Sequence, residues 1–169
     1  MTTGAAPRFE FDPSTVVASI EVFPKQEYEF QVGEPKAFRR TAGQGTDNEH
    51  DSFGVRFPLV IKQPDEYNNK RTIFSTYLQS EGAQAMAKQF IMAAMGFAKN
   101  ITEEKKYDAE ARGKNWDLDF STGAVGDAWR ELTGKRVIGS LDQTKNKNSG
   151  DAMQQFVSWR PIASGPINQ

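Results

Sequence analysis

The chain has 169 residues, of which 25% are charged and 37% hydrophobic, a net charge of −1 and no cysteine. This length favours one domain with its own core, and the composition argues against pervasive disorder. The lack of cysteine excludes disulfides, thiolate metal sites and cysteine nucleophiles. Because the net charge is close to zero, a site for a polyanion requires local clusters of Lys and Arg.

The start of the chain predicts a flexible N-terminal segment over residues 1–13. Phe9 and Phe11 alternate with charged residues there and are candidates for docking onto the domain. No apolar run reaches the roughly 20 residues that a bilayer requires, and residues 1–13 lack the pattern of a signal peptide. We therefore expect a cytoplasmic protein that does not associate with a membrane. If the protein is viral, this is the cytoplasm of the host cell. Residues 16–23 fit a short strand or a turn of helix equally well.

Alternating apolar and polar residues predict a first strand over residues 27–40. Gly33 and Pro35 interrupt this strand and indicate a bulge or a bend, as in a strand that curls through a small barrel. Residues 41–52 contain glycine, asparagine and acidic residues and predict a long polar loop.

Two further strands are predicted over residues 53–63 and 70–78, with a turn at residues 64–69 between them. In the second strand the odd-numbered positions from 55 to 61 are all apolar, which indicates one buried face. Pro58 interrupts it and favours an edge strand or a bulge. The short connections indicate a meander.

A helix is predicted over residues 81–97, with Ser80 as its N-cap and an apolar face that packs on the sheet. A charged, exposed helix is expected over residues 102–112. Residues 115–126 fit a loop anchored by its tryptophan and phenylalanine, and a short helix follows at residues 127–132.

The end of the chain predicts a β-hairpin with a basic tip. Residues 135–142 alternate as a strand, and residues 144–150 are a polar loop that carries Lys145 and Lys147. A return strand is expected over residues 151–160, where it stops at a proline.

The order of these elements predicts a mainly β (α+β) domain: a five-stranded OB-fold-like Greek-key barrel with a helix between strands three and four. The domain is expected to cover residues 14–162, with an insertion at 99–126 and a flexible tail at 163–169. OB-fold barrels grip oligonucleotides with two loops, which correspond here to residues 41–52 and 143–150.

Short motifs carry a resemblance to known proteins: Phe9-Glu10-Phe11-Asp12, Pro24-Lys25-Gln26-Glu27-Tyr28-Glu29-Phe30, Leu132-Thr133-Gly134-Lys135-Arg136-Val137, and Phe156 to Pro161. With these motifs the chain resembles a family of bacteriophage OB-fold single-stranded-DNA-binding proteins found with replication and recombination genes. Gln26 stands where this family leads us to expect glycine, the insertion is longer than expected, and the chain lacks the acidic C-terminal end of bacterial single-strand binders.

The resemblance implies binding of single-stranded DNA with little sequence preference, without a cofactor, a metal or catalytic activity. Phage replication or recombination proteins and a second copy of the chain are further candidate partners. Single-strand binding requires cations along the phosphates and aromatic faces on which bases stack. The candidate cations are Arg39, Arg40, Arg56, Lys62, Lys70, Arg71, Lys135, Arg136, Lys145, Lys147 and Arg160. The candidate aromatic residues are Phe38, Tyr77, Phe156 and Trp159.

Each of these residues also has a structural interpretation, because cations at strand ends are commonly solvated and aromatic residues of small barrels commonly belong to the core. Two other functions stay open at this point. A virion structural or assembly protein could use the same barrel, and a small nuclease could use Asp117 and Asp119 with a divalent metal. The sequence contains no recognisable nucleophile and base pair.

Overall fold

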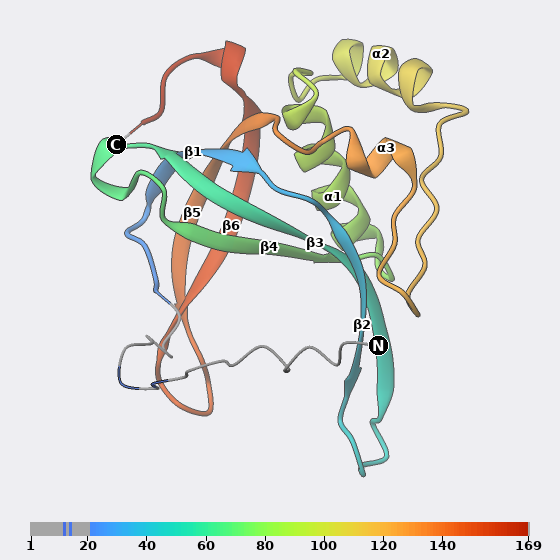
Figure 1. Ribbon diagram of the computed structural model, residues 1–169, viewed down its shortest axis with the longest axis vertical. Coiled ribbons are helices and arrows are strands. Elements are labelled where there is room, and N and C mark those ends of the chain that lie inside the picture. The colour runs from blue at the N-terminus through green and yellow to red at the C-terminus, as the bar shows by residue number, and fades with distance from the viewer. Residues whose placement is uncertain (1–11, 13, 15–20, 169) are drawn as a thin grey trace, which may run out of the picture.

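Six antiparallel strands and three α-helices make up the part of the chain that the computed structural model describes, which is residues 12, 14 and 21–168 (Figure 1). The strands are β1 (Gln26–Val32), β2 (Lys36–Ala42), β3 (His50–Gln63), β4 (Arg71–Tyr77), β5 (Arg136–Lys145) and β6 (Ala152–Pro161). The helices are α1 (Glu81–Ala94), α2 (Ile101–Ala111) and α3 (Asp127–Arg130), with 3-10 turns at Asp65–Tyr67 and Ile162–Ser164.

The strands form one sheet in the order β4-β3-β1-β5-β6, and β2 pairs with the first half of β3. Strands β4 and β6 are the two ends of this order, and no ladder joins them within residues 21–168. The prediction of a β-rich α+β domain with a meander and a terminal hairpin is confirmed. The predicted barrel is not confirmed, because the sheet is open.

The core lies between the curled sheet and α1, which contacts β4, β5 and β6 (Figure 1). The predicted buried face of β3 is confirmed, since its odd-numbered residues from Val55 to Ile61 have no exposed surface. The ring of Phe74 on β4 lies 4.8 Å from that of Trp159 on β6, and Phe90 of α1 lies 4.7 Å from the same tryptophan. Side-chain packing therefore connects the two end strands, and such aromatic pairs each contribute about 0.5–1.5 kcal/mol beyond burial.

The bend predicted at Gly33 and Pro35 is confirmed, and it divides the expected first strand into β1 and β2. The Gly33 N–H donates to the Pro58 carbonyl (2.7 Å) at this break. The prediction of an edge strand at Pro58 is wrong, because β3 pairs on both sides. The ladder is nevertheless irregular there, since residues 33–35 lie opposite only residues 57 and 58 of β3. In an antiparallel ladder the N–H and C=O of one residue face the same neighbour, so the N–H that Pro58 lacks would face the break.

Both predicted loops are shorter than expected. Strands β2 and β3 pair until only residues 43–49 remain as a loop, instead of 41–52. Strands β5 and β6 likewise leave residues 146–151, instead of 143–150. Hairpin strands continue to pair through polar sequence until the chain has to reverse, so low hydrophobicity alone overestimates the length of a loop.

The helices lie close to the positions predicted from the sequence. The Ser80 hydroxyl accepts a hydrogen bond from the Ala83 N–H (3.1 Å) and caps α1 as predicted. This helix ends before residue 97 because Gly96 adopts a φ of 90°. The exposed second helix and the short third helix are confirmed. Among the described residues, no helix is both long and apolar enough to cross a bilayer.

The loop at residues 115–126 packs through its two aromatic residues, as predicted. The ring of Trp116 meets Trp129 of α3 edge to face at 5.1 Å, and Phe120 lies 4.9 Å from Phe53 of β3. The flexible segment expected over residues 1–13, including Phe9 and Phe11, lies outside the described residues apart from Asp12. Of the segment 16–23, only its last three residues are described, and they form neither helix nor strand.

The C-terminal residues, predicted to be a flexible tail, fold back on β1 as far as Asn168. Arg160 of β6 forms an ion pair with Glu27 of β1 (2.7 Å) and donates to the Gly165 carbonyl (2.9 Å). The Asn168 N–H also donates to the Glu27 carboxylate (2.8 Å). The hydrogen bond from Arg160 lowers the pKa of Glu27 below its ordinary value of 4.5.

We expect Glu27→Gln to lower the free energy of unfolding at pH 7 by about 1–3 kcal/mol, because a charge-assisted hydrogen bond is lost. A carboxylate with a lowered folded-state pKa stabilises the protein fully above its unfolded pKa, and this stabilisation disappears as pH falls through the folded-state pKa. Urea denaturation at pH 7 and pH 3 should therefore show a difference between wild type and variant at pH 7 that shrinks at pH 3. An equal difference at both pH values would contradict this role of the ion pair.

Candidate nucleic-acid interface

The outer face of β2, β3 and β4 carries aromatic and cationic side chains in adjacent rows. The strand register places Phe38, Gly54 and Tyr77 side by side, with one residue from each strand. Lys36 and Arg56 are opposite each other in the next row. Since alternate residues of a strand share a face, the side chains of these two rows point to the same side of the sheet.

Four of these side chains contact one another and form what we call the aromatic-arginine cluster, made of Phe38, Arg40, Arg56 and Tyr77. The rings of Phe38 and Tyr77 meet edge to face at 5.4 Å. The Arg56 guanidinium lies 4.8 Å from the centre of the Phe38 ring, and Arg40 Nη1 donates to the Tyr77 hydroxyl at 3.4 Å. The cluster holds two guanidinium groups at an aromatic surface, where planar bases and phosphates can both be bound.

Phe38 supports this cluster from below and is not open to a base. Only 9% of its surface is exposed, because Arg56 covers the ring. A Cβ atom at Gly54 would lie 2.9 Å from the Phe38 ring and 2.2 Å from the Thr76 carbonyl oxygen, so only glycine leaves room for the ring here. The face of Phe38 under Arg56 is thus covered, and the half-buried Tyr77 is the more accessible ring of the cluster.

The cations of this face are not neutralised. No ion pair among the described residues includes Lys36, Arg40, Arg56 or Arg71. Arg39, by contrast, lies between Phe38 and Arg40 in sequence, points to the opposite face and pairs with Asp51 (3.5 Å). The outer face thus presents a strip of positive charge on a protein whose net charge is −1.

Two hairpins project on the same side of the molecule, the β2–β3 hairpin and the β5–β6 hairpin (Figure 1). Lys145 at the end of β5 and Lys147 in the following loop are exposed, as predicted. Neither lysine forms an ion pair within residues 21–168. The second hairpin thus adds free positive charge on the side toward which both hairpins project.

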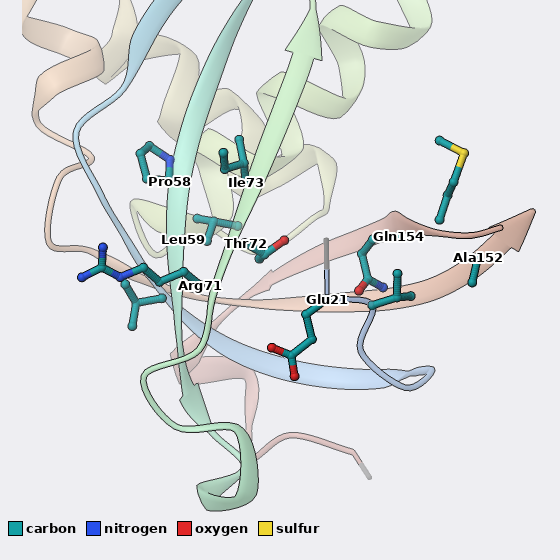
Figure 2. A pocket seen from close by; sticks show the side chains of 11 residues that line it. Glu21, Pro58, Leu59, Arg71, Thr72, Ile73, Ala152 and Gln154 are labelled. Carbon is teal, nitrogen blue, oxygen red and sulfur yellow. The ribbon is translucent and has the colours of Figure 1, made fainter. Parts of the chain in front are cut away.

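A groove of about 700 Å³, which we call the seam groove, lies where β4 and the start of β6 remain unpaired (Figure 2). Arg71 and Ile73 line it from β4, Pro58 from β3, and Met153 and Gln154 from β6. Its volume is within the range of small-molecule sites, and most of its walls are apolar.

Three predicted site residues at the end of β6 serve the protein interior instead. Trp159 is only 4% exposed, and Phe156 stacks on it at 5.1 Å with an interplanar angle of 17°. Arg160 is occupied by Glu27 and by carbonyl groups of the C-terminal residues. The structure therefore places Trp159 in the aromatic core and Arg160 in an ion pair with Glu27, apart from the face that carries the aromatic-arginine cluster.

The remaining predicted cations lie away from the cluster. Lys135 and Arg136 are at the start of β5, the end opposite to the hairpin, and Arg136 pairs with Glu29 (3.5 Å). Lys62 donates to Asn69 (3.2 Å). Lys70 pairs with Glu21 at 3.5 Å. The structure therefore unites Arg40, Arg56, Arg71 and Tyr77 on one face.

Three residues of this surface were absent from the predicted set: Lys36, Ile73 and Met153. Lys36 precedes Phe38 by two positions, so strand alternation alone could have assigned it to the same face. Ile73 is two positions from Arg71 and could have been found in the same way. Nothing in the sequence indicates that Met153 lies across a groove from Ile73, since that depends on how the sheet curls.

The aspartates considered for a nuclease lie in the insertion and not at this surface. The Asp119 carboxylate accepts hydrogen bonds from the Ser121 hydroxyl (2.6 Å) and the Thr122 N–H (3.2 Å). These bonds, chiefly the one from Ser121, lower the pKa of Asp119 to about 2. The described residues contain no group of three or more His, Cys, Asp or Glu that could hold a metal ion.

Comparison with known proteins assigns the chain to no family. No protein-family model matches the sequence, and no curated protein is significantly similar to it. The argument for function therefore rests on the residues of this chain and on their geometry.

We expect Gly54→Ala to lower the free energy of unfolding by about 1–3 kcal/mol, because the added methyl group collides with the Phe38 ring and with main chain. Gly82→Ala is the matched control, since a Cβ there has open space within the first turn of α1. The control should be neutral or stabilising by up to about 1 kcal/mol. Urea denaturation of both variants measures the difference, and equal stabilities would contradict the tight packing described for Gly54.

Proposed function

We propose that this protein binds single-stranded DNA with little sequence preference and serves phage DNA replication or recombination. The observation that carries the proposal is the strip of unpaired cations around an accessible aromatic ring, on the face of β2, β3 and β4. Sequence-tolerant single-strand binders combine these two features, because every nucleotide offers a phosphate and a flat base.

The topology supports an OB-fold-like domain as the framework of this site. If β1 and β2 count as one bent strand, the order of the sheet and the position of α1 between β4 and β5 match the OB-fold pattern. The two projecting hairpins then correspond to the loops with which such domains grip oligonucleotides. The open seam between β4 and β6 is the point at which this chain differs from a closed barrel.

In the proposed mechanism, the DNA backbone follows the cations of the outer face. Arg40, Arg56 and Lys36 contact phosphates, while Tyr77 stacks on a base. Lys145 and Lys147 approach the strand from the other hairpin. Because each phosphate contact releases counterions, affinity falls steeply as salt increases.

We expect Arg40→Ala and Arg56→Ala each to weaken binding of a labelled oligo-dT and to reduce the slope of log affinity against log salt by about 0.7–1. Tyr77→Phe should retain most of the affinity, whereas Tyr77→Ala should lose about 1–3 kcal/mol through the lost stack. Fluorescence anisotropy at several salt concentrations, with a duplex competitor and without divalent metal, measures these effects.

The matched control for these variants is Lys105→Ala, which removes an exposed cation from α2. This variant should bind like the wild type with an unchanged salt slope. If the wild-type protein does not bind oligo-dT even at low salt, the proposed function is wrong. If the control loses as much affinity as the cluster variants, the DNA lies elsewhere on the protein.

The hairpin lysines give a second test. Replacing Lys145 and Lys147 together by alanine should weaken single-strand binding and flatten its salt dependence by a slope of about 1.4–2, since two phosphate contacts are lost. Both side chains are exposed, so the thermal stability should stay unchanged. Wild-type affinity in a stably folded double variant would falsify the role of this hairpin.

A further inference from the structure

The seam groove combines apolar walls with Arg71, a cation that forms no ion pair within residues 21–168. Ile73 and Met153 keep 55% and 45% of their surface exposed, and they are among the few large apolar side chains of the described residues that are exposed to this extent. Ile73 lines the groove from β4 (Figure 2), and Met153 lines it from β6. Arg71 borders the groove and takes part in no ion pair of the described chain.

The groove continues the positive strip of the outer face. Arg71, Ile73 and Tyr77 occupy alternate positions of β4 and therefore point to the same side of the sheet. Ile73 is opposite Pro58, and Tyr77 is opposite Gly54 in the same ladder. Ile73 and Tyr77 are four positions apart along the strand, which is about 13 Å. A single strand that crosses the aromatic-arginine cluster along β4 thus reaches the groove next.

We propose that the seam groove binds one unpaired nucleobase of the DNA strand, between Ile73 and Met153, with its phosphate at Arg71. This inference rests on the proposed function and adds a second base site to it. An apolar slot beside a cation is complementary to a nucleotide, whose base is flat and weakly polar and whose phosphate is negative. The polarisable sulfur of Met153 makes favourable contacts with an aromatic ring.

The polar groups of the groove explain why this site would tolerate any base. The amide of Gln154 is already engaged, because it accepts from the Phe23 N–H (2.8 Å) and donates to the Asp142 carbonyl (3.0 Å). The carboxylate of Glu21, which also lines the groove, forms an ion pair with Lys70. This pairing reduces its repulsion of a phosphate. Recognition therefore relies on apolar contact with the base and not on hydrogen bonds to its edge.

The groove would also distinguish single strands from duplexes. A base can enter it only after it has left its stack and its partner, which costs several kcal/mol in a duplex and little in a single strand. The cations of the outer face attract both forms of DNA. The groove is therefore the part of the surface that confers preference for the unpaired strand.

The test is the double variant Ile73→Ser with Met153→Ser, which removes both apolar walls and leaves every cation in place. We expect about a tenfold loss of affinity for oligo-dT, an unchanged salt slope and unchanged duplex binding, so that the preference for single strands falls by the same factor. The matched control is Ile101→Ser, which changes an isoleucine that is 73% exposed on α2.

The outcomes separate this inference from the proposed function. If Arg40→Ala weakens binding while the groove variant binds like the wild type, the base site is wrong and single-strand binding stands. If the wild type binds no single strand, both are wrong. The groove variant could instead lose affinity with a reduced salt slope, or lose affinity for single strands and duplexes equally. Either result would show that the lost interaction is not a contact with an unpaired base, and the inference would be overturned.

A photocrosslinking experiment on the wild-type protein locates the base directly. An oligo-dT with a single 5-iodouracil, moved through the sequence one position at a time, should crosslink to Met153 or to its neighbours in β6 from at least one position. Mass spectrometry of the crosslinked peptide identifies the site. Crosslinks confined to peptides outside β4 and β6 would overturn the inference.

Discussion

The fold depends on a contact between aromatic rings at the two ends of an open sheet. Phe74 of β4, Phe156 and Trp159 of β6, and Phe90 of α1 pack together, and their ring centres lie between 4.7 and 5.2 Å apart in the closest pairs. Where these rings meet, the end strands are held together without a hydrogen-bonded ladder. Further along, beside residues 71–73, no ring of residues 21–168 spans the gap, and the seam groove remains.

Local sequence patterns were sufficient to predict the elements. The N-cap of α1, the buried face of β3, the bend after β1 and the terminal hairpin each depend on a few neighbouring residues, and each is confirmed. The closure of the sheet and the central position of β3 depend on which strands pair with each other. The alternation of residues along one strand does not predict that pairing. For this reason the sequence predicted an edge strand at Pro58, although the break that accommodates this proline is formed by a different segment, at Gly33.

The candidate site could be predicted only in part, because burial and ion pairing are properties of the folded chain. Arg39 and Arg40 are adjacent in sequence, yet they lie on opposite faces and only the first meets an acid. Trp159 and Tyr77 are both aromatic strand residues, yet one is central to the core and the other is accessible. Arg160 satisfied the sequence criterion of a cation beside aromatic residues, but Glu27 lies 133 positions away along the chain.

The contact between Gly33 and Pro58 also separates two hydrogen-bonded ladders of β3. Strand β3 pairs with β1 on one side of this point and with β2 on the other, and the proline offers no amide to connect the two ladders there. Strand β2 can therefore separate from β3 without breaking the hydrogen bonds between β1 and β3. Because β4 pairs with β3 on both sides of Pro58, we expect only the amides between β2 and β3 to undergo hydrogen exchange through this local opening, while those between β1, β3 and β5 stay protected.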